Sequence, residues 1–292
     1  MKENELREII FEFFSLVENR FESRESNLEN IRENDFATKV EKQILEDIEE
    51  FFSNREQVFD IQLEENLENF DRPDSPDYTV ILDSMDGSHH LIEGEGSFGP
   101  IIGISDCENP NFDDIIASGF LNLNSSKKYF AIKGEGCYKI SNDSRETIET
   151  SGKENIETGI NTKILLQQGF LANYPEIAEQ AWRHWCNDYG SQGQHFAMIA
   201  DGRRDLFISG GHSKLEAKPV NSPEELAGMY LILKEAGGAV TDWNGKTIAE
   251  NKIGMRKNHN HDIIAASSEE IAVNASIKLI PDKYKAEQSK GK

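Results

Sequence analysis

The sequence predicts a soluble protein that mixes α-helices and β-strands in two halves. Three observations favour this class. Apolar residues recur at helical spacing near the N-terminus, a β-branched run follows at Tyr78 to Leu82, and strands alternate with helices beyond residue 158. Apolar residue types make up 37% of the chain, which is enough for a sizeable core. The longest apolar runs are far too short to cross a bilayer.

The first half begins with two expected helices. Apolar residues at helical spacing place one near residues 6–17, and the second is expected to start at Thr38 and to continue to Phe52. The polar stretch 22–35 between them is expected to be a loop. Strands are then expected at 58–63, 78–82, 98–104, 115–123 and 128–132, separated by Gly, Asn and Pro.

The second half is expected to follow a polar tract at 141–158. This tract lacks a large apolar cluster, so it divides the chain into residues 1–145 and 146–292. Beyond it, the pattern predicts strands at 163–166, 206–209, 239–242 and 262–266, and helices at 175–187, 193–200, 223–235 and 268–279. The last dozen residues, rich in Lys and Glu, are expected to fray.

The charge balance argues against several classes of function. The chain has 53 acidic and 31 basic residues, a formal net charge of −22. A field of that sign repels nucleic acids and anionic membranes, so we expect neither as a partner. It would also repel a phosphorylated substrate unless bound cations neutralise the site. The three cysteines match neither a disulfide framework nor a zinc pattern, which favours a reducing cytoplasm.

The segment ILDSMDGS at residues 81–88 is the strongest candidate for chemistry. A buried strand is expected to end at Asp83, and a tight turn to present Asp86 shortly afterwards. Two carboxylates in these positions can share divalent cations, with the carbonyl of Met85 as another oxygen ligand.

Two further residues of this segment suit a phosphate. Gly87 lets the backbone come close to a ligand, and Ser88 adds a hydroxyl beside backbone N–H groups. An ordinary acidic turn after a strand would have the same composition, because Asp, Gly and Ser are common turn residues.

Several other segments follow a pattern that is known from one enzyme family. Glu64-Glu65 precedes the DSMDGS segment. The segments that follow it are, in order, YFAIKGEGCY, GS with ADGRRD, and EELAG with EAGGAVTDW. DSMDGS is similar to a D-P-x-D-G-[TS] signature, and Glu64-Glu65 to a G-E-E motif. The last pair is similar to a W-D-x-A-[AG]-G and E-A-G-G-x-[VL]-T-D block. Together they resemble the inositol monophosphatase superfamily of metal-dependent, lithium-sensitive phosphatases.

The resemblance implies a fold and an activity. The fold is an α+β, layered αβαβα sandwich of the inositol monophosphatase/fructose-1,6-bisphosphatase type, with its site between the two halves. The activity is Mg²⁺-dependent hydrolysis of a small phosphate monoester, with Mn²⁺ as another possible cofactor, by two or three metal ions. The implied substrates are an inositol monophosphate, fructose 1,6-bisphosphate or a nucleotide 3′-phosphate. We also expect a homodimer. A non-catalytic relative with a binding or regulatory role is the alternative.

The resemblance also assigns roles to individual residues. The implied metal ligands are Glu64, Asp83, Met85, Asp86 and Glu225. The implied catalytic residues are Glu64 and Ser88, which would position the attacking water, and Glu41, which stands where the family has an Asp. Substrate binding is implied for Asp86, Gly87, Ser88, His89, Gly190, Ser191 and Ser209.

The chain departs from the family pattern at three of these positions. Glu41 and Glu225 each replace an Asp, and each also fits a capping box that begins three residues earlier, at Thr38 or Ser222. A cap and a catalytic or metal role are not exclusive. Ser209 stands where the family has a substrate-reading Glu, so recognition of a polyol there stays open.

Overall fold

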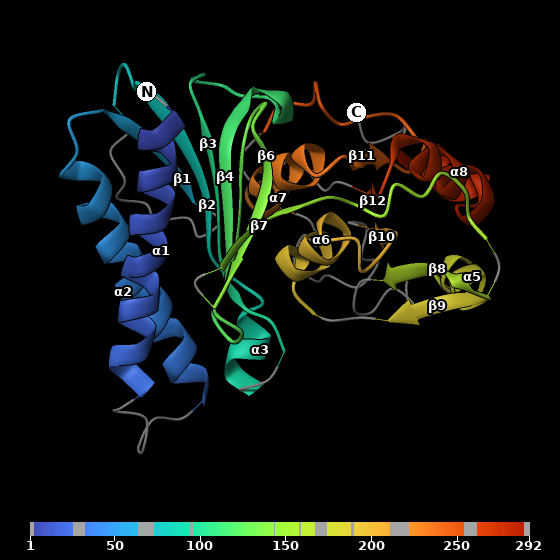
Figure 1. The fold of residues 1–292 in the computed structure, drawn as a ribbon, viewed down its shortest axis with the longest axis horizontal. Helices are drawn as coiled ribbons and strands as arrows, with labels where there is room; N and C mark the ends of the chain where they lie inside the picture. Colours follow the sequence, from blue (N-terminus) through green and yellow to red (C-terminus); the bar gives the residue numbers. More distant parts are fainter. Residues whose placement is uncertain are drawn as a thin grey trace.

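Five layers make up the fold, and they confirm the expected αβαβα sandwich (Figure 1). The computed structural model describes residues 3–25, 33–63, 73–93, 96–142, 144–157, 159–166, 174–187, 190–210, 222–253 and 262–288. From one side to the other, the layers are a helix pair, a seven-stranded sheet, two central helices, a five-stranded sheet and outer helices (Figure 1). Within the described residues, no helix combines the length and apolar character that a membrane span requires.

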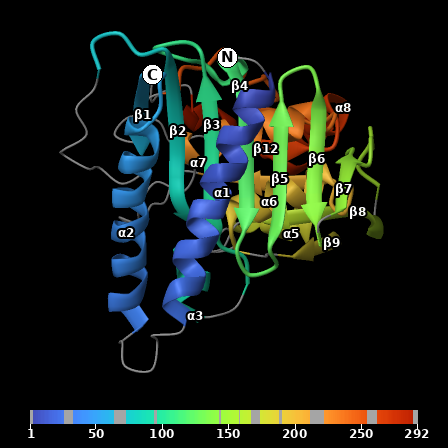
Figure 2. The ribbon, with the colours of Figure 1, turned by 60° about the vertical axis from the view of Figure 1, so that its left-hand side comes forward.

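The first layer consists of α1 (Glu3–Glu25) and α2 (Glu33–Ser53), which cover one face of the larger sheet (Figure 2). Apolar side chains from both helices form a core with the sheet, including Phe14 and Ile48, both fully buried. Both helices are longer than expected. Residues 22–25 belong to α1, and α2 begins at Glu33, so Thr38 lies inside a helix and cannot be its N-cap.

The larger sheet has the order β1-β2-β3-β4-β5-β6-β7. Its strands are β1 (Phe59–Leu63), β2 (Tyr78–Asp86), β3 (Gly99–Ser105), β4 (Ile115–Asn122), β5 (Lys127–Ile132), β6 (Gly136–Ser141) and β7 (Ser144–Ile148). β1 is parallel to β2, and each later strand is antiparallel to its predecessor. The short helix α3 (Ser88–Glu93) follows β2 directly. The boundary expected at residue 145 falls within β7.

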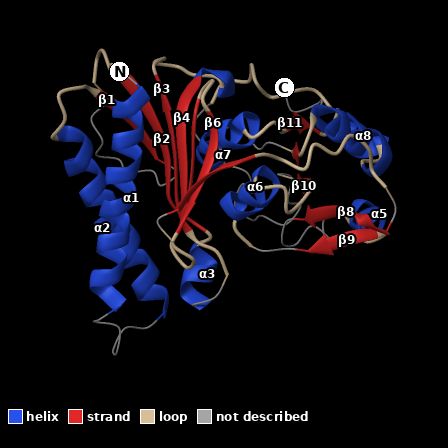
Figure 3. Cartoon of the chain, in the orientation of Figure 1, coloured by secondary structure: helices blue, strands red, loops and turns tan. Residues whose placement is uncertain are grey.

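The central layer holds α6 (Gln192–Ala200) and α7 (Pro223–Glu235) between the two sheets (Figure 3). Each helix starts at a serine N-cap, Ser191 for α6 and Ser222 for α7. α7 packs on β2, β3 and β4 of the larger sheet and also against α6. Its first turn therefore lies close to the larger sheet although it belongs to the second half of the chain.

The smaller sheet has the order β11-β12-β10-β8-β9. Its strands are β8 (Gly159–Leu166), β9 (His184–Asn187), β10 (Leu206–Ser209), β11 (Ala239–Asp242) and β12 (Ile263–Ala266). The outer helices are α5 (Pro175–Ala181), α8 (Glu269–Leu279) and α9 (Asp282–Gln288).

Two expectations for the second half are wrong. The helix expected at 175–187 ends at Ala181, and His184–Asn187 form β9 because they pair with β8 at the edge of the sheet. The tail that was expected to fray contains α9, whose Tyr284 packs edge-on against Tyr174 with ring centroids 5.3 Å apart.

Candidate metal centre

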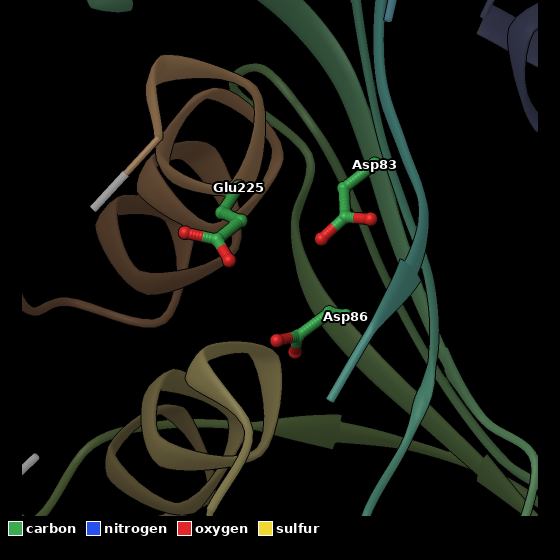
Figure 4. A group of neighbouring side chains, drawn as sticks. All are labelled: Asp83, Asp86 and Glu225. Carbon is green, nitrogen blue, oxygen red and sulfur yellow. The ribbon is translucent and has the colours of Figure 1, made fainter. Parts of the chain in front are cut away.

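Three carboxylates meet where the larger sheet faces the central helices. Asp83 and Asp86 come from β2, and Glu225 comes from the first turn of α7. One oxygen from each lies within 4.8 Å of the other two. Figure 4 shows the three side chains pointing toward one another. Asp83 is fully buried, Asp86 is 4% exposed and Glu225 is partly buried.

A β-bulge brings the two aspartates to the same side of β2. Residues three apart in a regular strand point to opposite faces. In the pairing of β2 with β3, Asp83 is opposite Ile101 and Asp86 is opposite Gly99, so β2 contains one extra residue between the two aspartates. The strand therefore does not stop at Asp83 as expected; it continues to Asp86, and the bulge replaces the expected turn.

Backbone N–H groups orient both aspartates. The N–H of Met85 donates to Asp83 Oδ1 at 2.9 Å. The N–H groups of Gln192 and Gly193, at the start of α6, donate to the two oxygens of Asp86 at 3.1 and 2.7 Å. A negative charge at this position is also favoured by the dipole of the helix.

Gly193 lets α6 approach Asp86 this closely. A Cβ at this position would lie 2.8 Å from Asp86 Oδ2 and 2.6 Å from Phe120 Cε2. Gln192 and Gly193 were not among the site residues expected from the sequence. Their position directly after Gly190-Ser191 was the available signal, but the pairing with Asp86 joins segments far apart in the chain.

Glu225 caps α7 and lies in the carboxylate cluster at the same time. Ser222 N–H donates to its Oε2 at 3.0 Å, and its own N–H donates to Ser222 Oγ at 3.1 Å. Both bonds of a capping box are thus present. Glu225 therefore completes the helix cap and lies among the candidate metal ligands in the same side-chain conformation.

The donor set fits a hard divalent cation. Ionised carboxylates this close repel one another, and the burial of Asp83 and Asp86 increases the cost of charge that is not neutralised. Carboxylate oxygens are the ligands that Mg²⁺ and Ca²⁺ prefer in proteins. Each carboxylate also accepts a backbone hydrogen bond, which fixes its orientation before an ion arrives.

The segment after Asp86 leads into α3. Gly87 has a φ of +78°, a left-handed conformation that suits glycine and turns the chain sharply after β2. Ser88 begins α3 and is partly buried, whereas His89 is exposed. Met85 is 4% exposed within the bulge.

The other candidate substrate residues lie in two places, Gly190 and Ser191 at the start of α6 and Ser209 at the end of β10. Gly190 precedes α6 and has a φ of +89°. Ser191 is 1% exposed, and its hydroxyl accepts a hydrogen bond from Gln194 N–H as the N-cap of α6. Ser209 is fully buried at the end of β10, where its carbonyl accepts a hydrogen bond from the indole of Trp243 at 3.1 Å.

Two candidate site residues lie wholly or partly outside the part of the chain that the structure describes. Glu64 follows β1 but lies outside the described residues. Glu41 belongs to α2, but its side chain is not among those described. The end of β1 is described, and Leu63 pairs with Leu82, the residue before Asp83.

Two motif carboxylates stabilise the fold away from the cluster. Glu235, from the EAGG segment, accepts hydrogen bonds from the N–H groups of Gly134 and Gly136 at 2.9 and 3.0 Å. These bonds attach the turn between β5 and β6 to the end of α7. Asp205, from the GRRD segment, accepts from Ser151 Oγ at 2.7 Å and from Lys163 N–H at 2.8 Å. The Glu235 bonds therefore connect residues from the two parts of the chain, whereas the Asp205 bonds lie within the second part.

Solved structures share the whole fold. Staphylococcal IMPase-II matches with a TM-score of 0.69 at 17% identity, over 97% of this chain and 94% of that chain. The suhB protein of Bartonella henselae matches with a TM-score of 0.67 at 17% identity, over 93% and 97%. At these identities the comparison establishes the fold.

Sequence comparisons identify the family. The fructose-1,6-bisphosphatase/inositol-1-monophosphatase of Methanocaldococcus jannaschii is 25% identical over 197 residues, 68% of each chain. The bifunctional NADP phosphatase/NAD kinase of Methanococcus maripaludis is 23% identical over 187 residues, 59% of this chain but 31% of that protein, so this chain matches less than a third of that relative's length. The model of the inositol monophosphatase family matches residues 4–276, and the chain therefore belongs to that family.

Proposed function

We propose that this protein is a metal-dependent phosphatase that hydrolyses a small phosphate monoester. The observation that carries the proposal is the cluster of Asp83, Asp86 and Glu225, in which one oxygen from each lies within 4.8 Å of the other two, between β2 and the first turn of α7. Phosphatase names among the relatives support the same reaction class. Mg²⁺ is the proposed cofactor and Mn²⁺ a possible substitute, because the donors are all carboxylate oxygens.

The three carboxylates are the proposed ligands, with the Met85 carbonyl and Glu64 as further ones. The pairing of Leu63 with Leu82 on two parallel strands supports Glu64, because Glu64 and Asp83 are the residues that follow this pair in the sequence. Bound Mg²⁺ would supply Lewis-acid activation of water and would neutralise charge on the phosphate. The bound cations would also reverse the local field in a protein with a net charge of −22.

The residues around the cluster have proposed tasks of their own. Backbone N–H groups of Gly87, Ser88 and His89 would bind phosphate oxygens, since they follow Asp86 directly in the chain. Ser88 and Glu64 would orient the attacking water, and the Glu64 carboxylate would accept its proton, with Glu41 as a further catalytic candidate. Water attacks phosphorus, the ester P–O bond breaks, and the products are orthophosphate and an alcohol.

The rest of the substrate is proposed to contact residues at the start of α6 and the end of β10. Gly190 and Ser191 precede the N–H groups that hold Asp86, and Ser209 is the last residue of β10. The relatives' names give a panel to test: inositol 1-phosphate, fructose 1,6-bisphosphate and NADP. A homodimer is also proposed, and a mass measurement in solution tests it.

Release of phosphate from an aryl phosphate and from this panel, with and without Mg²⁺, tests the proposal. We expect turnover that requires the metal in wild type and is abolished in Asp83→Asn, because Asp83 is a fully buried proposed ligand in the cluster. Circular dichroism and the Tm without metal serve as controls for folding. If Asp83→Asn keeps near wild-type activity in Mg²⁺, the proposed site is wrong. If wild type neither binds Mg²⁺ nor turns over any substrate, the non-catalytic alternative is favoured.

A further inference from the structure

A network of four polar side chains connects the larger sheet to the start of α6. Asn122 lies at the end of β4, Ser97 lies just before β3, and Ser191 and Gln194 belong to the cap and first turn of α6. Asn122 Nδ2 donates to Ser97 Oγ at 2.7 Å and to Gln194 Oε1 at 2.9 Å. Ser97 Oγ donates to Gln194 Oε1 at 3.3 Å and accepts from Ser191 Oγ at 3.4 Å.

The hydrogen bonds of this network determine the orientation of both amides. Asn122 Oδ1 accepts from the N–H of Ser125 at 3.0 Å, so the other end of the amide must be the donor. That donor points at Gln194, which must therefore present its oxygen. Gln194 acts here as an acceptor, and its own N–H completes the Ser191 cap at 3.2 Å.

The network lies beside the carboxylate cluster without belonging to it. Ser97, Asn122 and Ser191 are 4%, 5% and 1% exposed, so the hydrogen bonds that Ser97 makes with the other two are shielded from water, whereas Gln194 is partly buried. Between Ser191 and Gln194 are the two residues whose N–H groups hold Asp86. Any movement of the first turn of α6 relative to β4 would therefore move the donors of Asp86.

We propose that Gln194 is a positioning residue for the metal centre. Through Asn122 and Ser97 it holds the first turn of α6 against the larger sheet, so that the backbone donors keep Asp86 in the orientation that binds the cation. Gln194 itself touches neither cation nor substrate in this role. The inference rests on the proposed function, because it requires Asp86 to be a metal ligand.

Calorimetric titration of Mg²⁺ into the full-length protein tests this role. Gln194→Met removes the acceptor at nearly constant size, and Gln194→Glu keeps it. We expect Gln194→Met to weaken Mg²⁺ binding by about 10-fold to 100-fold, as losses of hydrogen bonds around metal ligands do. Gln194→Glu should bind at least as tightly as wild type. In activity assays, the Mg²⁺ midpoint of Gln194→Met should rise while the rate at saturating Mg²⁺ is retained.

Tyr129→Phe is the matched control at the other end of the same helix. Tyr129 OH donates to Asp201, the C-cap of α6, at 3.4 Å, so this variant also loses a bond between β5 and the helix. Its Mg²⁺ affinity should equal that of wild type, whatever its Tm. Ser97→Ala provides a second test in case Gln194→Met does not fold, and it should also weaken Mg²⁺ binding.

Three results would overturn the inference. Wild-type Mg²⁺ affinity in Gln194→Met and Ser97→Ala would show that the network does not position Asp86. Equal losses in Gln194→Met and Gln194→Glu would exclude the acceptor as the cause, and an equal loss in Tyr129→Phe would indicate general destabilisation. Failure of the proposed function is distinguishable, because wild type itself would then show no Mg²⁺ binding.

Discussion

Replacing Glu225 by glutamine separates its role as a helix cap from its role as a metal ligand. Its Oε2 accepts from Ser222 N–H at 3.0 Å, and its own N–H donates to Ser222 Oγ at 3.1 Å. Glutamine keeps an oxygen for the first bond and leaves the second unchanged, so the capping box is retained. The variant removes one negative charge from three carboxylates that lie within 4.8 Å of one another.

The two roles predict losses of different size. Loss of the cap in Ser222→Ala should lower the free energy of unfolding by about 1 kcal/mol. One charge about 4 Å from a cation contributes about 4 kcal/mol per unit of cation charge at an effective dielectric constant of 20. A tenfold change in Kd corresponds to about 1.4 kcal/mol, which is about a third of that attraction. Glu225→Gln should therefore weaken Mg²⁺ binding by at least about tenfold, whereas Glu225→Asp keeps the charge and should retain measurable turnover.

The assay is a Mg²⁺ titration of phosphatase activity, with thermal unfolding in metal-free buffer as the control. We expect Glu225→Gln to melt like wild type without metal but to need more Mg²⁺ for half-maximal activity. Ser222→Ala should show the reverse, a lower Tm and an unchanged midpoint. An unchanged midpoint in Glu225→Gln would remove Glu225 from the metal centre and would support the non-catalytic alternative.

Mg²⁺ or Mn²⁺ should raise the Tm of wild type by mass action and raise that of Asp86→Asn much less; equal shifts in both proteins would contradict ligation by Asp86. Gly193→Ala should weaken Mg²⁺ binding, since its Cβ would lie 2.8 Å from Asp86 Oδ2 and 2.6 Å from Phe120 Cε2. The same titration checks it, and a wild-type curve would mean that α6 tolerates the extra group. Burial raises the pKa of the Cys137 thiol, so a thiol reagent at neutral pH should label the half-buried Cys186 in the native protein and Cys137 only after unfolding, as mass spectrometry can show. Labelling of native Cys137 at the rate of Cys186 would refute its burial.

The spacing of apolar residues predicted most helices and strands, because the buried face of each element repeats with the period of a helix or a strand. The start of α7 was predicted from Ser222 and Pro223, which are local signals for a helix N-terminus. β9 was missed because four residues carry no readable period, and its strand conformation comes from pairing with β8. The start of α2 was placed too late because Thr38 looks like a cap, yet the helix begins at Glu33.

The sequence by itself determined which carboxylates are present, that Asp86 is three residues after Asp83, and that Gly87 follows directly. It also predicted the Ser222–Glu225 capping box, because such a box involves only residues three apart. Only the tertiary structure decided that the three carboxylates meet. Asp83 and Asp86 share a face because the pairing of β2 with β3 includes a bulge, and Glu225 joins them because α7 packs on the same sheet. The N–H groups that hold Asp86 come from α6, and contacts between segments so far apart depend on how the whole chain packs.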